Sequence, residues 1–371
     1  MGGGNARFSL SLLAFFFSLW SDITDMSFIN SVFSKLKRHP KRIVFPDGDD
    51  PRVIRAAQLF YELELGVPVL LGKRADIERI ALAEGASLDH VAVINPETSS
   101  ELPVFCQRLE RLDRYRNMGV NDSRAMMVNH NYFAAMMIQN GLADGLVGGI
   151  NSYGGSLLRP LLNLVKPLPH AEVVSSCTIV ELEDKKHGDD GVLIFADTGV
   201  VPNPTMAQLA SIALQAGLLA RQVFGKRPRV AMLSFSTKGS AKTESTEKVA
   251  GATLLARQLI ENSGAEIAVD GEMQADAALD PILAEMKLGP SLVGGRANVL
   301  VFPDLNSGNI AVKLVHHFAA ARTYGQLFLG LTRPAVDLSR GADSEEIACM
   351  AALAGLQAIE YRKLYPEKSE D

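Results

Sequence analysis

The chain has 371 residues, of which 47% are hydrophobic and 21% are charged, a composition typical of an ordinary globular protein. Because single hydrophobic cores usually stop growing at roughly 250–300 residues, this length favours two domains. The net charge of −5, without any block of like charges, argues against nucleic acid or an anionic membrane surface as the main partner.

Residues 1–25 are dominated by the apolar run FSLSLLAFFFSLW, which follows Arg7. Its 13 residues are too few to span a bilayer comfortably, and no small-residue cleavage site of a signal peptide follows it. Met26 then opens a stretch that reads as a natural start. We therefore expect residues 1–25 to be a non-native or disordered extension without a role in the fold.

From Arg42 the chain alternates short β-branched runs with helical patterns, which is typical of α/β proteins with largely parallel sheets. Residues 42–50 predict a strand that runs into a polar turn, and Pro51 then begins a helix over 51–64. Further elements of the first half are strands at 67–72, 90–96 and 144–149 and a helical stretch at 122–141.

The pattern restarts near residue 170. After residue 310 we expect almost only helix, and because no new strand series follows, this last part is expected to pack back on the first domain. The elements predicted in between are strands at 172–182, 191–199, 228–236, 266–273 and 297–305 and a long helix at 205–225.

Ligands of open α/β folds bind beyond the carboxyl ends of the strands, so the loops after strands are where we search for a site. The loop SFSTKGSAKTES follows one predicted strand and offers Ser234, Ser236 and Lys238, together with backbone N–H groups, to an anion. It lacks the spacing of a P-loop. The alternative interpretation is a solvated loop.

The stretch FPDLNSGNIAVKLV has the same form. A strand is expected to end at Pro303, and a helix to begin near Asn309. Asn306 and Asn309 are therefore candidates for contact with a ligand beyond the strand. The alternative is an Asx turn and a helix N-cap around Asp304.

The stretch VDGEMQADAAL, residues 269–279, is expected to place three carboxylates, Asp270, Glu272 and Asp276, after another strand, which suggests a metal site. No histidine is spaced to join them, so we do not predict a metal. The three cysteines are far apart and form neither a metal motif nor a disulfide framework, which favours a reducing, cytoplasmic compartment.

The glycine-rich stretch GGINSYGGSLLRP enters a helix that carries Arg159 near its start. It lacks the GxGxxG spacing of a dinucleotide site, so we do not predict NAD as a cofactor. Arg159 is either an ordinary surface arginine or a bidentate ligand for an anion in a cleft.

The stretch VDLSRGADSEEI places Ser339, Arg340 and Gly341 just before the last predicted helix. Asp343 and Glu346 have the spacing of a helix-capping box, which is the structural explanation for Glu346. An arginine beside a helix N-terminus is suited to hold an anion, and a carboxylate one turn away is suited to act as a general base. This combination is appropriate for acyl transfer from an acyl phosphate.

With these residues, the sequence resembles the phosphate acetyltransferases. The resemblance covers essentially everything after Met26 and is also seen with phosphate butyryltransferases and the C-terminal regions of some malic enzymes, whose catalytic region this chain does not carry in front. The matching motifs, in chain order, are IVFPDGDDPRVIRAA, NGLADGLVGG, RVAMLSFSTKGSA, VDGEMQADAAL, NVLVFPDLNSGNIAVKLV and VDLSRG.

The resemblance implies two three-layer α/β domains with mostly parallel sheets and an interdomain cleft, as in isocitrate and isopropylmalate dehydrogenases. Domain I would comprise residues 26–168 and 326–371, and domain II, residues 169–325, would be inserted. The resemblance further implies a homodimer, coenzyme A or acetyl-CoA and acetyl phosphate or phosphate as substrates, and no metal or prosthetic group in the chemistry.

The resemblance also implies roles for single residues. Ser339 would lie near the coenzyme A thiol and the reacting carbonyl, and Arg340 would engage the phosphoryl group. Arg159 would line the site, and Glu346 would be the base for the thiol. A further family arginine falls at Arg114 or Arg116, and we assign Arg114 to substrate binding.

Two departures from the family pattern concern the site. Many members carry aspartate where this chain has Glu346, which keeps the acid but changes its reach. Many read GPILQGL where this chain has GQLFLGL, so that Leu329 replaces a polar side chain. Propanoyl or butyryl transfer therefore remains an alternative to acetyl transfer, and a non-catalytic acetyl-CoA-binding regulatory module is the alternative of another class.

Overall fold

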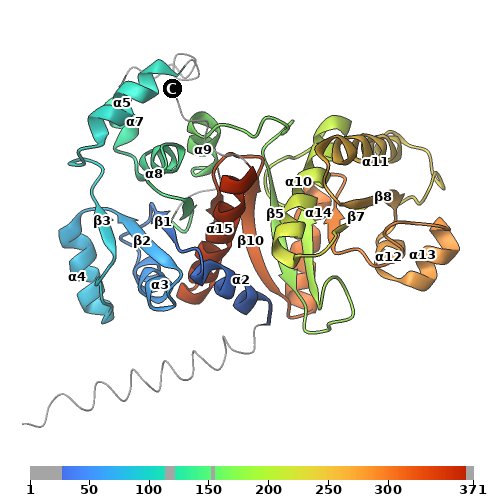
Figure 1. Ribbon diagram of the computed structural model, residues 1–371, viewed down its shortest axis with the longest axis horizontal. Helices are drawn as coiled ribbons and strands as arrows, with labels where there is room; N and C mark the ends of the chain where they lie inside the picture. The colour runs from blue at the N-terminus through green and yellow to red at the C-terminus, as the bar shows by residue number, and fades with distance from the viewer. Residues whose placement is uncertain (1–26, 113–121, 152–154, 365–371) are drawn as a thin grey trace, which may run out of the picture.

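The computed structural model describes residues 27–112, 122–151 and 155–364 (Figure 1). Within this part a single 11-stranded sheet runs through the whole molecule, in the order β3-β2-β1-β4-β11-β10-β5-β6-β9-β7-β8. The strands are β1 (Lys41–Phe45), β2 (Gly66–Leu71), β3 (Ala92–Ile94), β4 (Gly145–Gly148), β5 (Ser175–Glu181), β6 (Val192–Ala196), β7 (Arg229–Leu233), β8 (Ala268–Met273), β9 (Val299–Val301), β10 (Arg322–Leu329) and β11 (Ala335–Asp337).

The sheet is mostly parallel. Of the strand pairings between described residues, seven are parallel, and the three antiparallel ones all involve β10 or β5 in the middle of the sheet. The predicted mixed α/β fold with a mostly parallel sheet is confirmed.

Helices surround the sheet, and several carry the caps that their sequences predict. Pro51 occupies the first turn of α3, and the Asp50 side chain accepts a hydrogen bond from the Arg52 N–H. The helices are α2 (Ser27–Lys37), α3 (Pro51–Glu62), α4 (Arg74–Glu84), α5 (Leu102–Arg111), α7 (Ser123–Met127), α8 (His130–Gln139), α9 (Leu158–Leu164), α10 (Met206–Phe224), α11 (Glu244–Ser263), α12 (Ala275–Leu279), α13 (Pro281–Leu288), α14 (Leu305–Phe318) and α15 (Ser344–Leu364).

Alternation along the strands produces three layers. In β1, Ile43 and Phe45 join the core formed with α2, α3 and α15, whereas Val44 between them joins the core formed with α5, α8 and α9. In β5, Ile179 packs toward α10, and its neighbour Val180 packs on the side of α12 and α13. Each half of the sheet is therefore covered by helices on both faces.

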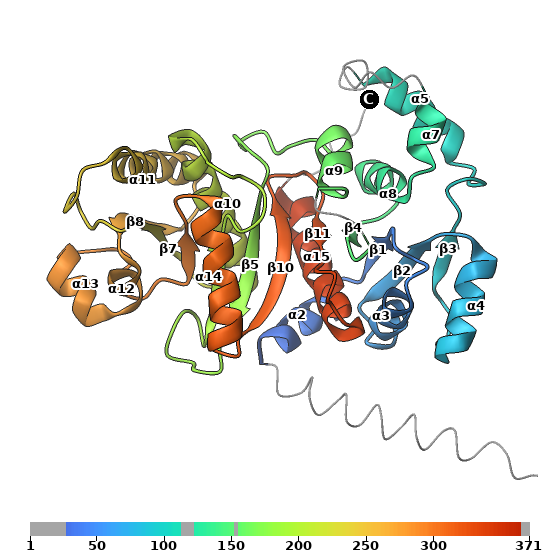
Figure 2. The ribbon, with the colours of Figure 1, turned by 180° about the vertical axis from the view of Figure 1, so that it is seen from behind.

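The prediction that the chain is almost all helix after residue 310 is wrong. β10 and β11 lie there, and β10 pairs with β5 near the centre of the sheet. Its apolar residues Leu327, Phe328 and Leu329 are consecutive and buried on both faces, so they lack the alternation that identifies a half-exposed strand. The C-terminal helix of this last part does pack back on the first half of the chain, because α15 contacts α2, α3 and β4 (Figures 1 and 2).

The predicted division into domains falls inside this continuous sheet. β10 contains residues 325 and 326, between which the second domain was predicted to end and the first to resume, and it pairs with β11 on one side and β5 on the other. The exact boundaries therefore stay a prediction. None of the helices in the described ranges combines the length and the apolar character needed to cross a membrane.

Candidate active site

A pocket of about 1080 Å³ lies between α14, β10 and the segment that leads into α15. In Figure 2 these two helices flank β10. Among the polar residues that line the pocket are Thr198, Asn309, Lys313, His316, His317, Arg322, Gln326, Asp337, Ser339, Asp343, Glu345 and Glu346.

Ser339 and Glu346 meet at this pocket because a tight turn joins β11 to α15. The N–H of Gly341 donates to the Ser339 hydroxyl at 3.3 Å, and the N–H of Ala342 donates to the Ser339 carbonyl at 3.0 Å. Asp343 then caps the helix, since its Oδ1 accepts the N–H of Glu346 at 2.8 Å. The predicted cap by Asp343 is confirmed, and it uses only the backbone of Glu346, whose carboxylate lines the pocket.

The surroundings of Glu346 disfavour its charged form. Burial raises the pKa of the Glu346 carboxyl, the nearby Asp343 charge raises it further, and His316 opposes the shift. The His316 ring is held by a 3.0 Å hydrogen bond from Nδ1 to the Ala321 carbonyl, which can only accept. A carboxyl group with a raised pKa in a pocket is a candidate general base.

A second carboxylate, Asp337, lines the pocket at the end of β11. Burial, together with the charge of Asp47 at the end of β1, raises the pKa of Asp337 to about 6. Asp47 itself accepts the N–H groups of Gly149 at 3.0 Å and Ile150 at 3.3 Å. The glycine is needed there, because φ is +100° and an added Cβ would lie 2.0 Å from Asp337 Oδ1.

Cys349 also lines the pocket, but it is a poor nucleophile. Burial, with the neighbouring carboxylates Glu345, Asp343 and Glu346, raises the pKa of its thiol to about 12. A thiol with this pKa is almost wholly protonated at neutral pH. Because the thiolate is the reactive form, Cys349 has little nucleophilic character.

Asn309 lies in the pocket and donates from Nδ2 to the Thr198 carbonyl at 3.0 Å. The helix that carries it begins earlier than predicted, at Leu305 rather than near Asn309. The alternative N-cap interpretation is confirmed, because Asp304 accepts the Ser307 N–H at 2.9 Å. Asn306 is therefore an exposed residue of the first helical turn. It is not among the described residues that line the pocket.

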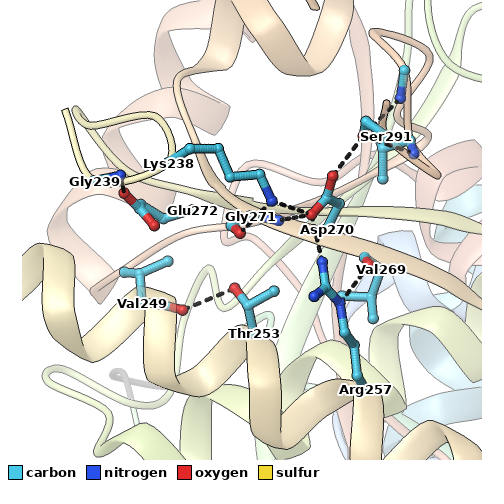
Figure 3. A network of polar contacts seen from close by, with 12 residues as sticks. Lys238, Gly239, Val249, Thr253, Arg257, Val269, Asp270, Gly271, Glu272 and Ser291 are labelled. Carbon is cyan, nitrogen blue, oxygen red and sulfur yellow. Dashed lines mark hydrogen bonds and ion pairs between the residues drawn. The ribbon is translucent and has the colours of Figure 1, made fainter. Parts of the chain in front are cut away.

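The loop that carries Ser234, Ser236 and Lys238 contacts carboxylates of its own chain, and Figure 3 shows Lys238 beside Asp270 and Gly239 beside Glu272. Glu272 Oε1 accepts the Ser236 hydroxyl at 3.1 Å and the Gly239 N–H at 2.7 Å. The Lys238 ammonium lies 2.5 Å from Asp270 Oδ1. The anions bound by this loop in the structure are thus internal, and none of its three predicted residues is among the described residues that line the pocket.

The predicted position of the three carboxylates after a strand is wrong for two of them. Asp270 and Glu272 lie within β8, and Asp276 lies on α12. Asp270 also forms an ion pair with Arg257, with 2.6 Å between Oδ1 and Nη2. Asp276 forms an ion pair with Lys287, with 2.6 Å between Oδ2 and Nζ. In the described part of the chain, no group of three acidic, histidine or cysteine side chains is placed to hold a metal ion.

The remaining predicted residues lie outside the pocket lining or outside the described residues. Arg159 is exposed in the first turn of α9, and the exposed Arg340 lies between the pocket residues Ser339 and Gly341. Arg114 falls outside the described residues. Leu329 is 4% exposed and belongs to the hydrophobic core, so its apolar side chain contributes to packing and does not line the pocket.

Several pocket residues were missed by the sequence analysis. Lys313 and His316 lie one turn apart on α14, and Arg322 and Gln326 lie on β10. The helical spacing of Asn309, Lys313 and His316 was available as a signal, because residues three and four apart share one face of a helix. Arg322 and Gln326 were not recognised as site residues, because the segment that forms β10 was predicted to be helical.

Comparison with known proteins identifies the family of the chain. The family model described as "Phosphate acetyl/butaryl transferase" matches residues 27–355. The phosphate acetyltransferase of Thermoanaerobacterium thermosaccharolyticum is 40% identical over 90% of this chain and all of its own length, and that of Acetivibrio thermocellus is 38% identical over 90% of this chain and 98% of its own. A phosphotransacetylase structure from Streptococcus pyogenes has a TM-score of 0.82 at 34% identity, covering 89% of this chain and 99% of its own. The chain therefore belongs to the phosphate acetyl/butyryltransferase family and is an acyltransferase, as its motifs predict.

Proposed function

We propose that this chain transfers an acetyl group reversibly between acetyl phosphate and coenzyme A, with both substrates held together in the pocket between α14 and α15. The observation that carries the proposal is that the Ser339 hydroxyl and the Glu346 carboxylate, predicted from one motif, line the same pocket. Basic side chains, Lys313 and Arg322, line it as well and are suited to the phosphate groups of both substrates.

In the proposed reaction Glu346 accepts the proton of the coenzyme A thiol. The thiolate attacks the carbonyl carbon of acetyl phosphate, and Ser339 donates a hydrogen bond to the oxygen that becomes negative. The C–O bond to phosphate then breaks, the carbonyl re-forms as a thioester, and phosphate leaves with the bonding electron pair. Arg340 is proposed to stabilise the leaving phosphate, as the family resemblance implies.

Direct attack by the coenzyme thiol is favoured over a covalent enzyme intermediate. Cys349 is the cysteine among the described pocket residues, and its raised pKa makes it a poor acyl acceptor. Initial rates with both substrates varied should therefore give intersecting double-reciprocal lines. Parallel lines, the pattern of a covalent intermediate, would contradict direct transfer.

The proposal is tested by mixing the protein with acetyl phosphate and coenzyme A and recording thioester absorbance. Formation of acetyl-CoA is expected, and its absence would favour the alternative of a regulatory module that only binds acetyl-CoA. Comparison of acetyl, propanoyl and butyryl phosphate in the same assay determines the acyl preference. Rates that increase with chain length would favour butyryl transfer, the alternative named in the family description.

Replacement of Arg340 by alanine is expected to remove most of the activity and to raise the KM for acetyl phosphate, because a charge-assisted contact to phosphate is lost. The measurement is kcat and KM with each substrate varied in turn. Arg333, whose Nε donates to the Ile138 carbonyl at 3.0 Å, provides a control arginine nearby in sequence. An Arg340→Ala variant with wild-type kinetics would remove Arg340 from the mechanism.

We also propose a homodimer in which α14 takes part. Ile310, Leu314 and Phe318 recur every fourth residue on this helix and are 54%, 48% and 85% exposed. Exposed apolar side chains that share one helix face favour association with a partner.

Leu314→Glu is therefore expected to shift the protein from dimer to monomer, because it places a charge in the apolar stripe. Light scattering coupled to gel filtration measures this change. Leu82→Glu on α4, where the leucine is 83% exposed, is the matched control and should leave the mass unchanged. A Leu314→Glu protein that remains dimeric would place the interface elsewhere.

Two further proposals concern the cofactors and the location of the protein. The family resemblance implies that the reaction needs no metal or prosthetic group, so prolonged chelator treatment should leave the rate unchanged. A cytoplasmic location is also proposed, because Cys106, Cys177 and Cys349 are free thiols, which is typical of a reducing compartment.

A further inference from the structure

We infer that Arg52, at the start of α3, is a positioning residue for the turn that carries Ser339 and Arg340. Arg52 Nη1 donates to the carbonyl of Arg340 at 2.8 Å and to that of Ala342 at 3.2 Å. These bonds link residues 288 and 290 positions apart in the sequence. This inference rests on the proposed function, because it assigns importance to the turn through Ser339.

The guanidinium of Arg52 is held in place by hydrogen bonds to the Asp50 carboxylate. Nε donates to Asp50 Oδ1 at 3.1 Å and Nη2 donates to Asp50 Oδ2 at 2.9 Å, which is a bidentate pair. The Asp50 side chain is 7% exposed. Burial alone raises the pKa of Asp50, but the hydrogen bonds and the charge of Arg52 outweigh burial and hold the pKa below its usual value. The pair is therefore a rigid support.

The same contacts argue against a direct role of Arg52 in substrate binding. A guanidinium has five N–H donors, and Arg52 directs Nε, Nη1 and Nη2 at acceptors of its own chain. Its side chain is 35% exposed, and the described lining of the pocket does not include it. Arg52 thus acts through the turn rather than on the reacting atoms.

The turn lies at the protein surface. Ser339 and Arg340 are exposed, and the turn is bonded internally by the Gly341 and Ala342 N–H groups. Without Arg52 the carbonyls of Arg340 and Ala342 would face water, and the Ser339 hydroxyl would sample a wider range of positions. A misplacement of about 1 Å at a reacting group is enough to cost on the order of 10²-fold in rate.

The test compares Arg52→Gln with Arg55→Gln. Arg55 is the matched control, because it lies three residues further along α3 and forms an ion pair with Glu84, with 2.6 Å between Nη2 and Oε2. Arg52→Gln is expected to lower kcat about 10- to 100-fold while KM for coenzyme A changes little. Hydrogen exchange of a peptide covering residues 338–343 should become faster in Arg52→Gln. Arg55→Gln should match the wild type in both measurements.

Asp50→Asn provides a second variant in case Arg52→Gln does not fold. Asparagine keeps the oxygen that caps α3 but loses the second carboxylate oxygen and the charge that hold Arg52. It should show the same two changes to a smaller extent, and the double variant should be no worse than Arg52→Gln alone, because both act through one contact.

Each outcome decides the question. Wild-type kcat in Arg52→Gln, or a lower kcat without faster exchange at 338–343, would overturn the inference, and so would an equal loss in Arg55→Gln. If the wild-type protein forms no acetyl-CoA, the proposed function fails. The exchange measurement still reports whether Arg52 holds the turn in that case.

Discussion

Replacing Glu346 by glutamine is expected to lower kcat by about 10²- to 10⁴-fold, the range in which a general base contributes. Glutamine has nearly the same size and fills the same place in the pocket, but it cannot accept the thiol proton. Steady-state rates of acetyl-CoA formation measure the change. Glu346→Asp, which restores the carboxylate with a shorter reach, should recover part of the activity.

The same variant separates the catalytic role of Glu346 from a role in helix capping. The cap of α15 uses the backbone N–H of residue 346, which glutamine retains. If capping were the main role, Glu346→Gln would keep nearly full activity and stability. Wild-type turnover in this variant would therefore remove Glu346 as the base.

The pH profile gives an independent measurement on Glu346. Its pKa is raised in the folded protein, mainly by burial, so the carboxylate is protonated up to a higher pH than an ordinary glutamate. Activity should increase with pH as the carboxylate loses this proton, and it should fall on the acid side. Glu346→Gln should remove this acid limb, and a limb that persists would belong to another group, such as Asp337.

The second large effect is expected for Ser339→Ala. Removing one donor to a developing oxyanion typically costs about 10²- to 10³-fold in kcat, and Ser339 lines the same pocket as Glu346. The donor is needed in the transition state, so KM for both substrates should change little. Kinetics with each substrate varied in turn measure both parameters.

Two controls belong to this experiment. Ser339→Thr keeps a hydroxyl and should retain more activity than Ser339→Ala. Ser344→Ala changes the first residue of α15, in the same region of chain, and should leave kcat unchanged. Equal kcat in the wild type and in Ser339→Ala would show that this hydroxyl makes no contribution to the transition state.

The fold was predictable where a signal is local. The helix α10 has a long periodic pattern, a capping box formed by Thr205 and Gln208, and Gly225 in the left-handed conformation at its end, so both of its ends were readable. β10 has no such signal, because its buried apolar residues are consecutive and its partners β5 and β11 are distant in sequence or very short. Its identity as a strand comes from the tertiary structure.

The same distinction applies to the site. Ser339 and Glu346 belong to one short motif that also caps a helix, so their proximity was predictable. The approach of Lys313 and Arg322 depends on how α14 packs beside β10, which no local pattern specifies. The loop with Lys238 has the composition of an anion site, but the anion beside it is Asp270 of its own chain. Composition indicates that a loop accepts a negative charge and does not indicate where that charge comes from.

The antiparallel pairing of β5 with β10 limits how this enzyme can open. β10 (Arg322–Leu329) pairs with β5 (Ser175–Glu181) along its length, with one irregularity between Tyr324 and Leu327, so the two halves of the sheet meet at a seam of paired strands. A hinge rotation of the kind that closes many two-lobed binding proteins would have to distort this seam. We therefore expect the pocket proposed for coenzyme A to be largely preformed, with the adjustments that admit the substrate confined to side chains and short turns at its rim.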